Sequence, residues 1–387
     1  MACFSINTKI FFGKEQLYDL HNYLRSLHLE KLLFVVDENI SSSNIFTKMT
    51  TAFYKEGFLI KKIEAVKVSE EPTYDKVDQF TAKLKGLDSD AIIAVGGGSI
   101  LDLAKGIGIL LKNTGKAVEY RGMDRVKNEG VPVICVPTTA GTGAEVTHTA
   151  SFIDVKSKTK LGINGRYVSS LCGVLLPEFT FSCPEKVTIS SGLDAMLHAI
   201  EAVSARTANK ITSMLGAKAF ALLYNNFKKV LEESNNYDAR EAMLVGSYYA
   251  GIAMMNAGGG PASGISYPLG VHYGINHGIA GGIFLPHVFE YNVSKGYKGY
   301  VEAYNNLPDA DLTLNDDEKS LDFVNKINKL YHDIGVPETL NSNGWNNINV
   351  DFLTELTMKQ RRGNLDLNPI PFGKTEVRDL INKIVKE

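Results

Sequence analysis

The chain has 387 residues, of which 44% are hydrophobic and 22% charged, and its formal net charge is −2. This balance is typical of a globular protein, and the length favours two domains over a single core. Lysines and arginines are scattered, and no apolar run approaches the roughly 18 residues of a membrane span. We therefore expect neither a nucleic acid nor a membrane as partner, but a small-molecule substrate.

The N-terminal sequence and the cysteines together predict the cellular compartment. The N-terminal residues lack the hydrophobic stretch and cleavage site of a signal peptide, and the four cysteines show no metal or redox spacing. Free thiols are typical of a reducing environment. We therefore expect a cytoplasmic protein.

The first half of the chain alternates strand-like and helix-like segments. Parallel strands that are buried on both faces have continuous apolar runs, and helices between them form β-α-β units. The pattern predicts strands at 31–37, 58–65, 91–95 and 131–137, and helices at 74–84 and 101–111. We expect an α/β domain over residues 1–183, with its ligand at the carboxyl ends of the strands.

The second half shows helical rather than alternating patterns. The predicted helices are 191–206, 217–233, 238–257 and 321–334. Residues 184–387 are therefore expected to form an all-helical domain.

A glycine cluster joins one predicted strand to the next helix. Gly96, Gly97 and Gly98 allow torsions and close approaches that a Cβ would forbid, and Ser99 and Asp102 follow. The first turn of such a helix presents N–H groups at its positive end, where a pyrophosphate can bind. The alternative is a tight turn without a ligand.

A second loop, Pro137–Thr147, follows the last predicted strand and is rich in threonine and glycine. Its hydroxyl and N–H groups are donors for a sugar or a phosphate. The same residues also suit a helix cap, so the pattern leaves both interpretations open.

Asp194 and His198 are four residues apart in a predicted helix and therefore share one face. A carboxylate and an imidazole so placed are ligands for a divalent transition metal. The alternative takes Ser191-x-x-Asp194 as a variant capping box and His198 as a core histidine.

Together these clusters resemble the iron-dependent, group III alcohol dehydrogenase family over nearly the whole chain. The resemblance implies a Rossmann-like NAD-binding domain, an all-α metal-holding domain, a dehydroquinate synthase-like architecture and a homodimer. The matching motifs are Gly96-Gly-Gly-Ser-Ile-Leu-Asp102-Leu-Ala-Lys105, Pro137-Thr-Thr-Ala-Gly-Thr-Gly-Ala-Glu-Val-Thr147, Gly192-Leu-Asp194-Ala-Met-Leu-His198-Ala-Ile-Glu201-Ala, His277-Gly278 and Leu285-Pro-His287-Val-Phe-Glu-Tyr-Asn292.

The resemblance also assigns residues to NAD. Asp37, at the end of an early strand, matches the position that bonds the adenosine ribose and repels the extra phosphate of NADP. Lys160 falls near the nicotinamide ribose and Phe179 against the adenine. The other cofactor contacts that the resemblance implies are Gly96, Gly97, Gly98, Ser99, Asp102, Thr138, Thr139, Thr142 and Thr147.

The chain departs from the family where the chemistry takes place. The family carries His-x3-His-x9-His, with the outer two histidines on the metal and the middle one relaying protons. Here the spacing is kept as Ser263-x3-Tyr267-x9-His277. One metal ligand has thus become serine, and the relay histidine has become tyrosine.

The departure leaves Asp194, His198 and His277 to hold Fe²⁺ or Zn²⁺. Three protein ligands still make a catalytic site, although we expect the metal to be weakly bound. Tyr267 or an additional histidine, His272, would supply the proton.

We therefore expect an oxidoreductase that moves hydride between NAD and an alcohol or carbonyl carbon, on a polar, sugar-type or phosphorylated substrate. One alternative is a metal-independent dehydrogenase, and another is a lyase related to dehydroquinate synthase that returns NAD unchanged. A non-catalytic NAD-binding protein is a third, but the retained Asp194, His198 and His277 argue against it.

Overall fold

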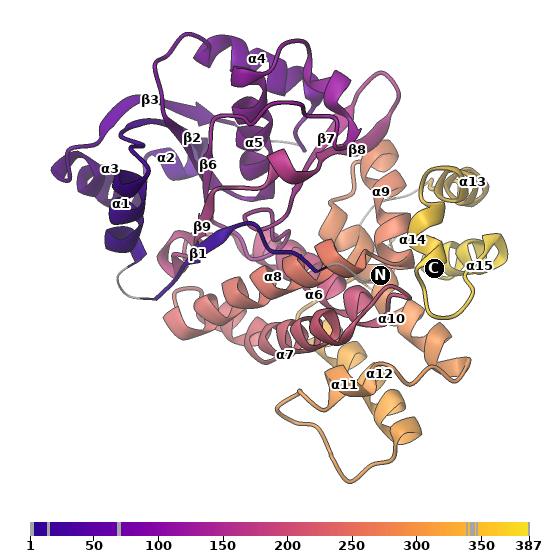
Figure 1. The fold of residues 1–387 in the computed structure, drawn as a ribbon. Coiled ribbons are helices and arrows are strands. Elements are labelled where there is room, and N and C mark those ends of the chain that lie inside the picture. The colour runs from indigo at the N-terminus through magenta and orange to yellow at the C-terminus, as the bar shows by residue number, and fades with distance from the viewer. Residues whose placement is uncertain are drawn as a thin grey trace. The chain divides into compact units, whose positions relative to one another are not determined.

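The computed structural model describes residues 4–13, 16–67, 71–337, 340, 345 and 347–385. The chain divides into two compact units. The first holds Ile6–Thr139 and Gly143–Cys183, and the second holds Pro184–Glu387 together with Met1–Ser5 and Ala140–Thr142. Figure 1 traces the elements of both units by colour along the chain. Within the described ranges, no helix has both the length and the apolar character that a membrane crossing needs.

The first unit is built on a parallel sheet with the strand order β1-β9-β6-β4-β2-β3. The four strands expected from the apolar runs are all present. The strands of this sheet are β1 (Lys9–Phe11), β2 (Lys31–Asp37), β3 (Leu59–Val66), β4 (Ala91–Gly96), β6 (Val133–Pro137) and β9 (Cys172–Val174).

Helices follow most of these strands, as parallel connections require. The two helices expected in this half are α4 and α5, whereas α1 and α3 were not predicted. The helices are α1 (Gln16–Ser26), α2 (Glu38–Ser41), α3 (Asn44–Lys55), α4 (Tyr74–Leu84) and α5 (Gly98–Lys112), with 3-10 turns η1 (Ala117–Tyr120), η2 (Arg166–Val168) and η3 (Pro177–Thr180).

The surroundings of strand β2 explain why its interior sequence is an unbroken apolar run. Successive side chains point to opposite faces of a strand. Leu33 and Val35 belong to the core on one face of the sheet, and Leu32, Phe34 and Val36 belong to the core on the other. All five are fully buried. Because both faces are covered, the interior positions 32–36 of this strand leave no place for a polar residue, and the charged Lys31 and Asp37 stand at its two ends.

A smaller sheet was not expected from the sequence. Its strands are β5 (Gly122–Met123), β7 (Thr149–Asp154) and β8 (Thr159–Asn164), in the order β5-β8-β7. Strands β7 and β8 form an antiparallel hairpin, and Lys158 has a φ of 49° in its turn. The hairpin carries Lys160, one of the predicted cofactor residues.

The second unit is helical, and its described residues contain no strand. This confirms the expected fold class, an α/β part followed by an all-α part. The helices are α6 (Glu185–Ser204), α7 (Lys210–Glu232), α8 (Tyr237–Ala257), α9 (Pro261–Tyr273), α10 (His277–Ser294), α11 (Val301–Tyr304), α12 (Asp316–Asp333), α13 (Val350–Gln360), α14 (Arg362–Asp366) and α15 (Lys374–Val385).

The start of α6 corrects one alternative. Pro184 is the N-cap, and the helix begins at Glu185, so Ser191 lies inside the helix rather than at its start. Its hydroxyl donates to the carbonyl of Thr188 at 3.3 Å. The capping-box interpretation of Ser191 and Asp194 is therefore wrong, because the first turn lies upstream of both residues.

Candidate active site

The glycine cluster forms the turn between β4 and α5. Gly96 ends the strand, and Gly98 is the first residue of the helix. A Cβ at Gly96 would lie 2.6 Å from the Cβ of Ile100, which real side chains do not tolerate. No side chain caps α5, whose N-cap is Gly97, so the N–H groups of its first turn can serve an anion.

Asp37 lies at the same edge of the sheet as this turn. It is the last residue of β2, which pairs in parallel with β4, so the carboxyl ends of both strands meet there. Its carboxylate accepts a hydrogen bond from the N–H of Asn39 at 2.9 Å and caps α2. The cap holds the negative charge at the edge where parallel sheets bind ligands.

A buried lysine holds the threonine-rich loop Pro137–Thr147, here called the threonine loop. Nζ of Lys105, which is 2% exposed, donates to the carbonyls of Ala144, Thr147 (2.9 Å) and Thr149 (3.0 Å). No helix begins in this loop, which leads instead into strand β7. The helix-cap interpretation of the loop is therefore wrong.

The start of the loop is joined to the glycine turn. The N–H of Thr138 donates to the carbonyl of Gly96 at 3.0 Å. A Cβ on Gly97 would meet the hydroxyl of Thr139 at 3.3 Å. Thr138 and Thr139 thus stand beside the predicted phosphate site, while Thr142 belongs to the short segment grouped with the helical unit.

Two other predicted cofactor residues already have protein partners. Asp102 accepts a hydrogen bond from the N–H of Ser151 at 2.9 Å. Burial raises the pKa of this carboxyl to about 6, against the opposing effects of the Lys105 ammonium and the Ser151 N–H. Lys160 forms an ion pair with Glu71 at 2.6 Å. Their contact with NAD stays a prediction.

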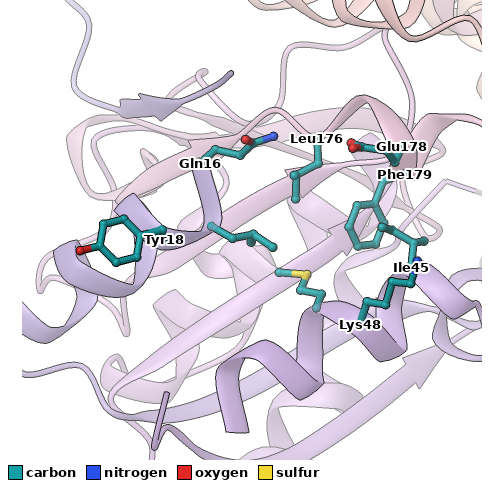
Figure 2. A pocket seen from close by; sticks show the side chains of 9 residues that line it. Gln16, Tyr18, Ile45, Lys48, Leu176, Glu178 and Phe179 are labelled. Carbon is teal, nitrogen blue, oxygen red and sulfur yellow. The ribbon is translucent and has the colours of Figure 1, made fainter. Parts of the chain in front are cut away.

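Phe179 lines a cavity of about 660 Å³ within the first unit (Figure 2). A volume of this size is typical of a ligand pocket. The lining is mainly apolar, with a few polar groups between α1, α3 and η3. The other lining residues are Gln16, Leu17, Tyr18, Ile45, Lys48, Met49, Leu176 and Glu178.

Three predicted metal ligands converge in the helical unit. Nε2 of His198 and Nε2 of His277 lie 3.5 Å and 3.6 Å from the same Asp194 oxygen, Oδ1. One candidate ligand atom from each residue lies within 4.8 Å of the others. Asp194 and His198 are buried on α6, and His277 is the first residue of α10. A carboxylate and two imidazoles so arranged fit Zn²⁺ or Fe²⁺.

A glycine lets the two helices approach closely enough to form this cluster. A Cβ at Gly278 would lie 1.9 Å from the carbonyl oxygen of Ser190 on α6. Only a residue without a side chain can stand there. Gly278 therefore places its neighbour His277 beside Asp194.

Nδ1 of His277, the ring nitrogen on the side away from Asp194, is hydrogen-bonded to a serine. Oγ of Ser266 lies 2.8 Å from Nδ1 of His277 and also donates to the carbonyl of Ser263 at 2.7 Å. Since the hydroxyl hydrogen is used on the carbonyl, the serine accepts the Nδ1–H of His277. The lone pair of Nε2 then faces Asp194, which is the tautomer that a metal requires.

Ser263 contacts a buried glutamate. Its hydroxyl donates to Oε2 of Glu201 at 2.5 Å, its N–H donates to Oε1 at 3.1 Å, and the N–H of Gly260 donates to Oε2 at 2.6 Å. Burial raises the pKa of the Glu201 carboxyl, and the three donors oppose this rise. Ser263 thus helps to satisfy this buried carboxylate.

The two proposed proton donors lie in different surroundings. The Tyr267 ring centre lies 4.5 Å from that of His277, and the guanidinium carbon of Arg361 lies 3.9 Å from the Tyr267 ring centre. Burial lowers the pKa of Arg361, opposed by Tyr267. His272 instead packs edge-on against Phe352, with ring centres 5.2 Å apart.

Sequence reasoning missed three residues of this region. Ser266 and Arg361 lie in no motif, and Arg361 lies far along the chain from the residues it contacts. Glu201 lies within the motif that contains Asp194 and His198, on the same side of α6 as His198, but the motif alone gave it no role.

Two family models together match most of the chain. The model "Iron-containing alcohol dehydrogenase" matches residues 7–174, and the model "Fe-containing alcohol dehydrogenase family, C-terminal" matches residues 188–385. The chain thus matches an N-terminal and a C-terminal part of one family in the expected order.

Individual relatives agree with this result. Long-chain-alcohol dehydrogenase 1 of Geobacillus thermodenitrificans is 29% identical, over 92% of this chain and 89% of its own length. The NAD-dependent methanol dehydrogenase of Bacillus methanolicus is 30% identical, over 76% of each chain. A solved 1,3-propanediol oxidoreductase superposes with a TM-score of 0.90 at 26% identity, covering 99% of this chain and all of its own. The chain belongs to the iron-containing alcohol dehydrogenase family and is an alcohol–aldehyde oxidoreductase.

Proposed function

We propose that this protein interconverts an alcohol and an aldehyde or ketone with NAD as cofactor and a divalent metal as Lewis acid. The observation that carries this proposal is the buried convergence of Asp194, His198 and His277 in a chain of this family. The substrates printed in the relatives' names range from methanol to long-chain alcohols, so they leave the substrate of this protein open.

The residues at the carboxyl ends of the parallel strands support NAD as the cofactor. The Bacillus methanolicus relative is named NAD-dependent. In this chain, the first turn of α5 would bind the pyrophosphate through backbone N–H groups, and Asp37 would accept from the ribose hydroxyls. The cavity beside Phe179 would take the adenine ring, and Thr138 and Thr139 would donate to the phosphates.

The metal would be held by Asp194, His198 and His277. When bound, NAD exchanges the hydride with the substrate carbon, and Fe²⁺ or Zn²⁺ stabilises negative charge on the substrate oxygen. The burial of Asp194 and His198 keeps competing water away from the ligands, and Ser266 orients the His277 ring.

Tyr267 is the proposed proton carrier. Its ring packs against that of His277, with the ring centres 4.5 Å apart, so the side chain lies beside a predicted metal ligand without being one. In the reducing direction, the phenol would donate a proton to the substrate oxygen and be left as a phenolate, and in the oxidising direction the phenolate would take the proton from the alcohol. His272, packed against Phe352, is the second candidate for this role.

Metal removal tests this proposal. Protein purified without chelator or added metal is analysed for bound iron and zinc, treated with a chelator, and assayed for aldehyde-dependent NADH oxidation. We expect turnover to fall at least about tenfold and to return with Zn²⁺ or Fe²⁺. NADH binding, followed by its fluorescence, is the control and should persist after chelation. Full turnover by metal-free protein would instead support the metal-independent dehydrogenase.

A further inference from the structure

A positively charged side chain lies beside the candidate metal ligands. The guanidinium carbon of Arg361 lies 3.9 Å from the ring centre of Tyr267, which in turn lies 4.5 Å from the ring centre of His277. The guanidinium is therefore less than about 9 Å from the His277 ring, a distance over which a partly buried charge still acts on a ligand.

The backbone around Arg361 holds the side chain in this position. Arg361 lies between α13 and α14, and its N–H donates to the carbonyl of Thr357 at 2.8 Å. On α9, a Cβ at Gly264 would lie 3.1 Å from the Cβ of Asn364 and 3.6 Å from the Cβ of Arg361. The glycine thus allows the turn that carries Arg361 to pack closely on the helix that carries Tyr267.

A stacked guanidinium is suited to bind an acid. The Arg361 guanidinium carbon lies 3.9 Å from the Tyr267 ring centre, and a guanidinium in general carries its five N–H donors along the edge of its own plane. That edge matches the paired oxygens of a carboxylate, sulfonate or phosphonate. Because the group is partly buried, an anion would gain more from it than from an arginine in water.

We propose that Arg361 binds an acidic group of the substrate, so that the enzyme acts on short aldehydes and alcohols that carry an acid at the end far from the reacting carbon. This inference rests on the proposed function, because Asp194, His198 and His277 fix where the reacting oxygen lies. The alternative role of Arg361 is to clamp α13 and α14 to α9, with no contact to the substrate.

A matched pair of substrates separates these two roles. Succinic semialdehyde and butanal have the same carbon chain and differ in the carboxylate. Values of kcat/KM with NADH are measured for both aldehydes in wild type, Arg361→Met and Arg361→Lys. We expect wild type to prefer the acid, Arg361→Met to lower the acid-to-neutral ratio about 10- to 100-fold, and Arg361→Lys to keep part of it. Any effect transmitted through Tyr267 acts on both aldehydes and cancels in the ratio.

The neighbouring arginine provides the control. Arg362 is half exposed and pairs with Asp366 at 2.8 Å, so Arg362→Gln removes the same charge one residue away. We expect this variant to leave the ratio unchanged. Equal losses for both aldehydes in Arg361→Met would overturn the inference and leave the proposed function standing.

A binding measurement does not depend on turnover. Calorimetry with butyrate, which has the carboxylate but no reactive carbonyl, is carried out on wild type and Arg361→Met. Butyrate binding that weakens about tenfold or more in the variant supports the inference even if neither aldehyde is reduced, an outcome that would count only against the proposed function. Absent or unchanged butyrate binding, together with no acid preference, contradicts the role of Arg361.

Discussion

The two predicted sites, one in each unit, are built from different parts of the polypeptide. In the α/β unit, the predicted phosphate site consists of backbone N–H groups at the Gly96–Gly98 turn, and it lies on contiguous residues. In the helical unit, the predicted metal site consists of three side chains on two helices. At the phosphate site, the glycines matter because they leave room for the backbone. At the metal site, the side chains themselves are the ligands.

This difference predicts how each site fails. A backbone site tolerates side-chain exchange until a Cβ blocks the turn, whereas a side-chain site is lost with a single ligand. The three predictions below test this contrast.

The largest effect is expected in the side-chain site. His198→Ala removes one of three imidazole or carboxylate ligands, so we expect metal content to fall below about a tenth and turnover to fall at least about 100-fold. Elemental analysis and steady-state kinetics measure both. The exposed His332 offers the control His332→Ala, which should change neither. If His198→Ala fails to fold, the isosteric Asp194→Asn replaces it, and normal metal content in either variant would refute the ligand set.

An intermediate effect is expected in the backbone site. Gly96→Ala places a methyl group 2.6 Å from the Cβ of Ile100, so the turn must shift. We expect a loss of about 1–3 kcal/mol in the free energy of unfolding and NADH binding weakened about tenfold. Gly97→Ala meets only the side chain of Thr139, with the hydroxyl at 3.3 Å and the methyl group at 3.5 Å, which can yield, and should cost less stability. Denaturant titration and NADH fluorescence check both variants, and the opposite order would contradict the account of the turn.

The smallest effect is expected for Asp37, whose side chain would set the preference of the phosphate site for NAD over NADP. Asp37→Asn keeps an oxygen that can accept from Asn39 but removes the negative charge, so NADP should gain on NAD by about five- to tenfold. Asp37→Gly should relax the preference as well, and should also cost about 1 kcal/mol of stability because the cap of α2 is lost. Titrations of both cofactors give the ratio. Tighter binding of NADP than NAD by wild type would show that Asp37 has another role.

Much of the architecture could be predicted because local pattern and tertiary environment agree. Strand β2 is apolar at its interior positions 32–36 since these are covered on both faces, and the expected 31–37 matches Lys31–Asp37. The small sheet was missed because its strands are partly exposed and mix polar with apolar residues. The sequence of the loop at 137–147 suits a helix cap as well as a set of hydrogen-bond donors, and only the structure shows that it leads into strand β7 and is held by Lys105.

For the site, the sequence determined the spacing that places Asp194 and His198 on one helical face, and the glycines that make the β4–α5 turn possible. Only the tertiary structure decided that His277 reaches the same Asp194 oxygen, that Ser263 bonds Glu201, and that Arg361 stacks on Tyr267. The reason is physical. Helical periodicity fixes neighbours three or four residues apart, whereas contacts between helices depend on how closely the backbones pack, and here glycines such as Gly264 and Gly278 set that distance.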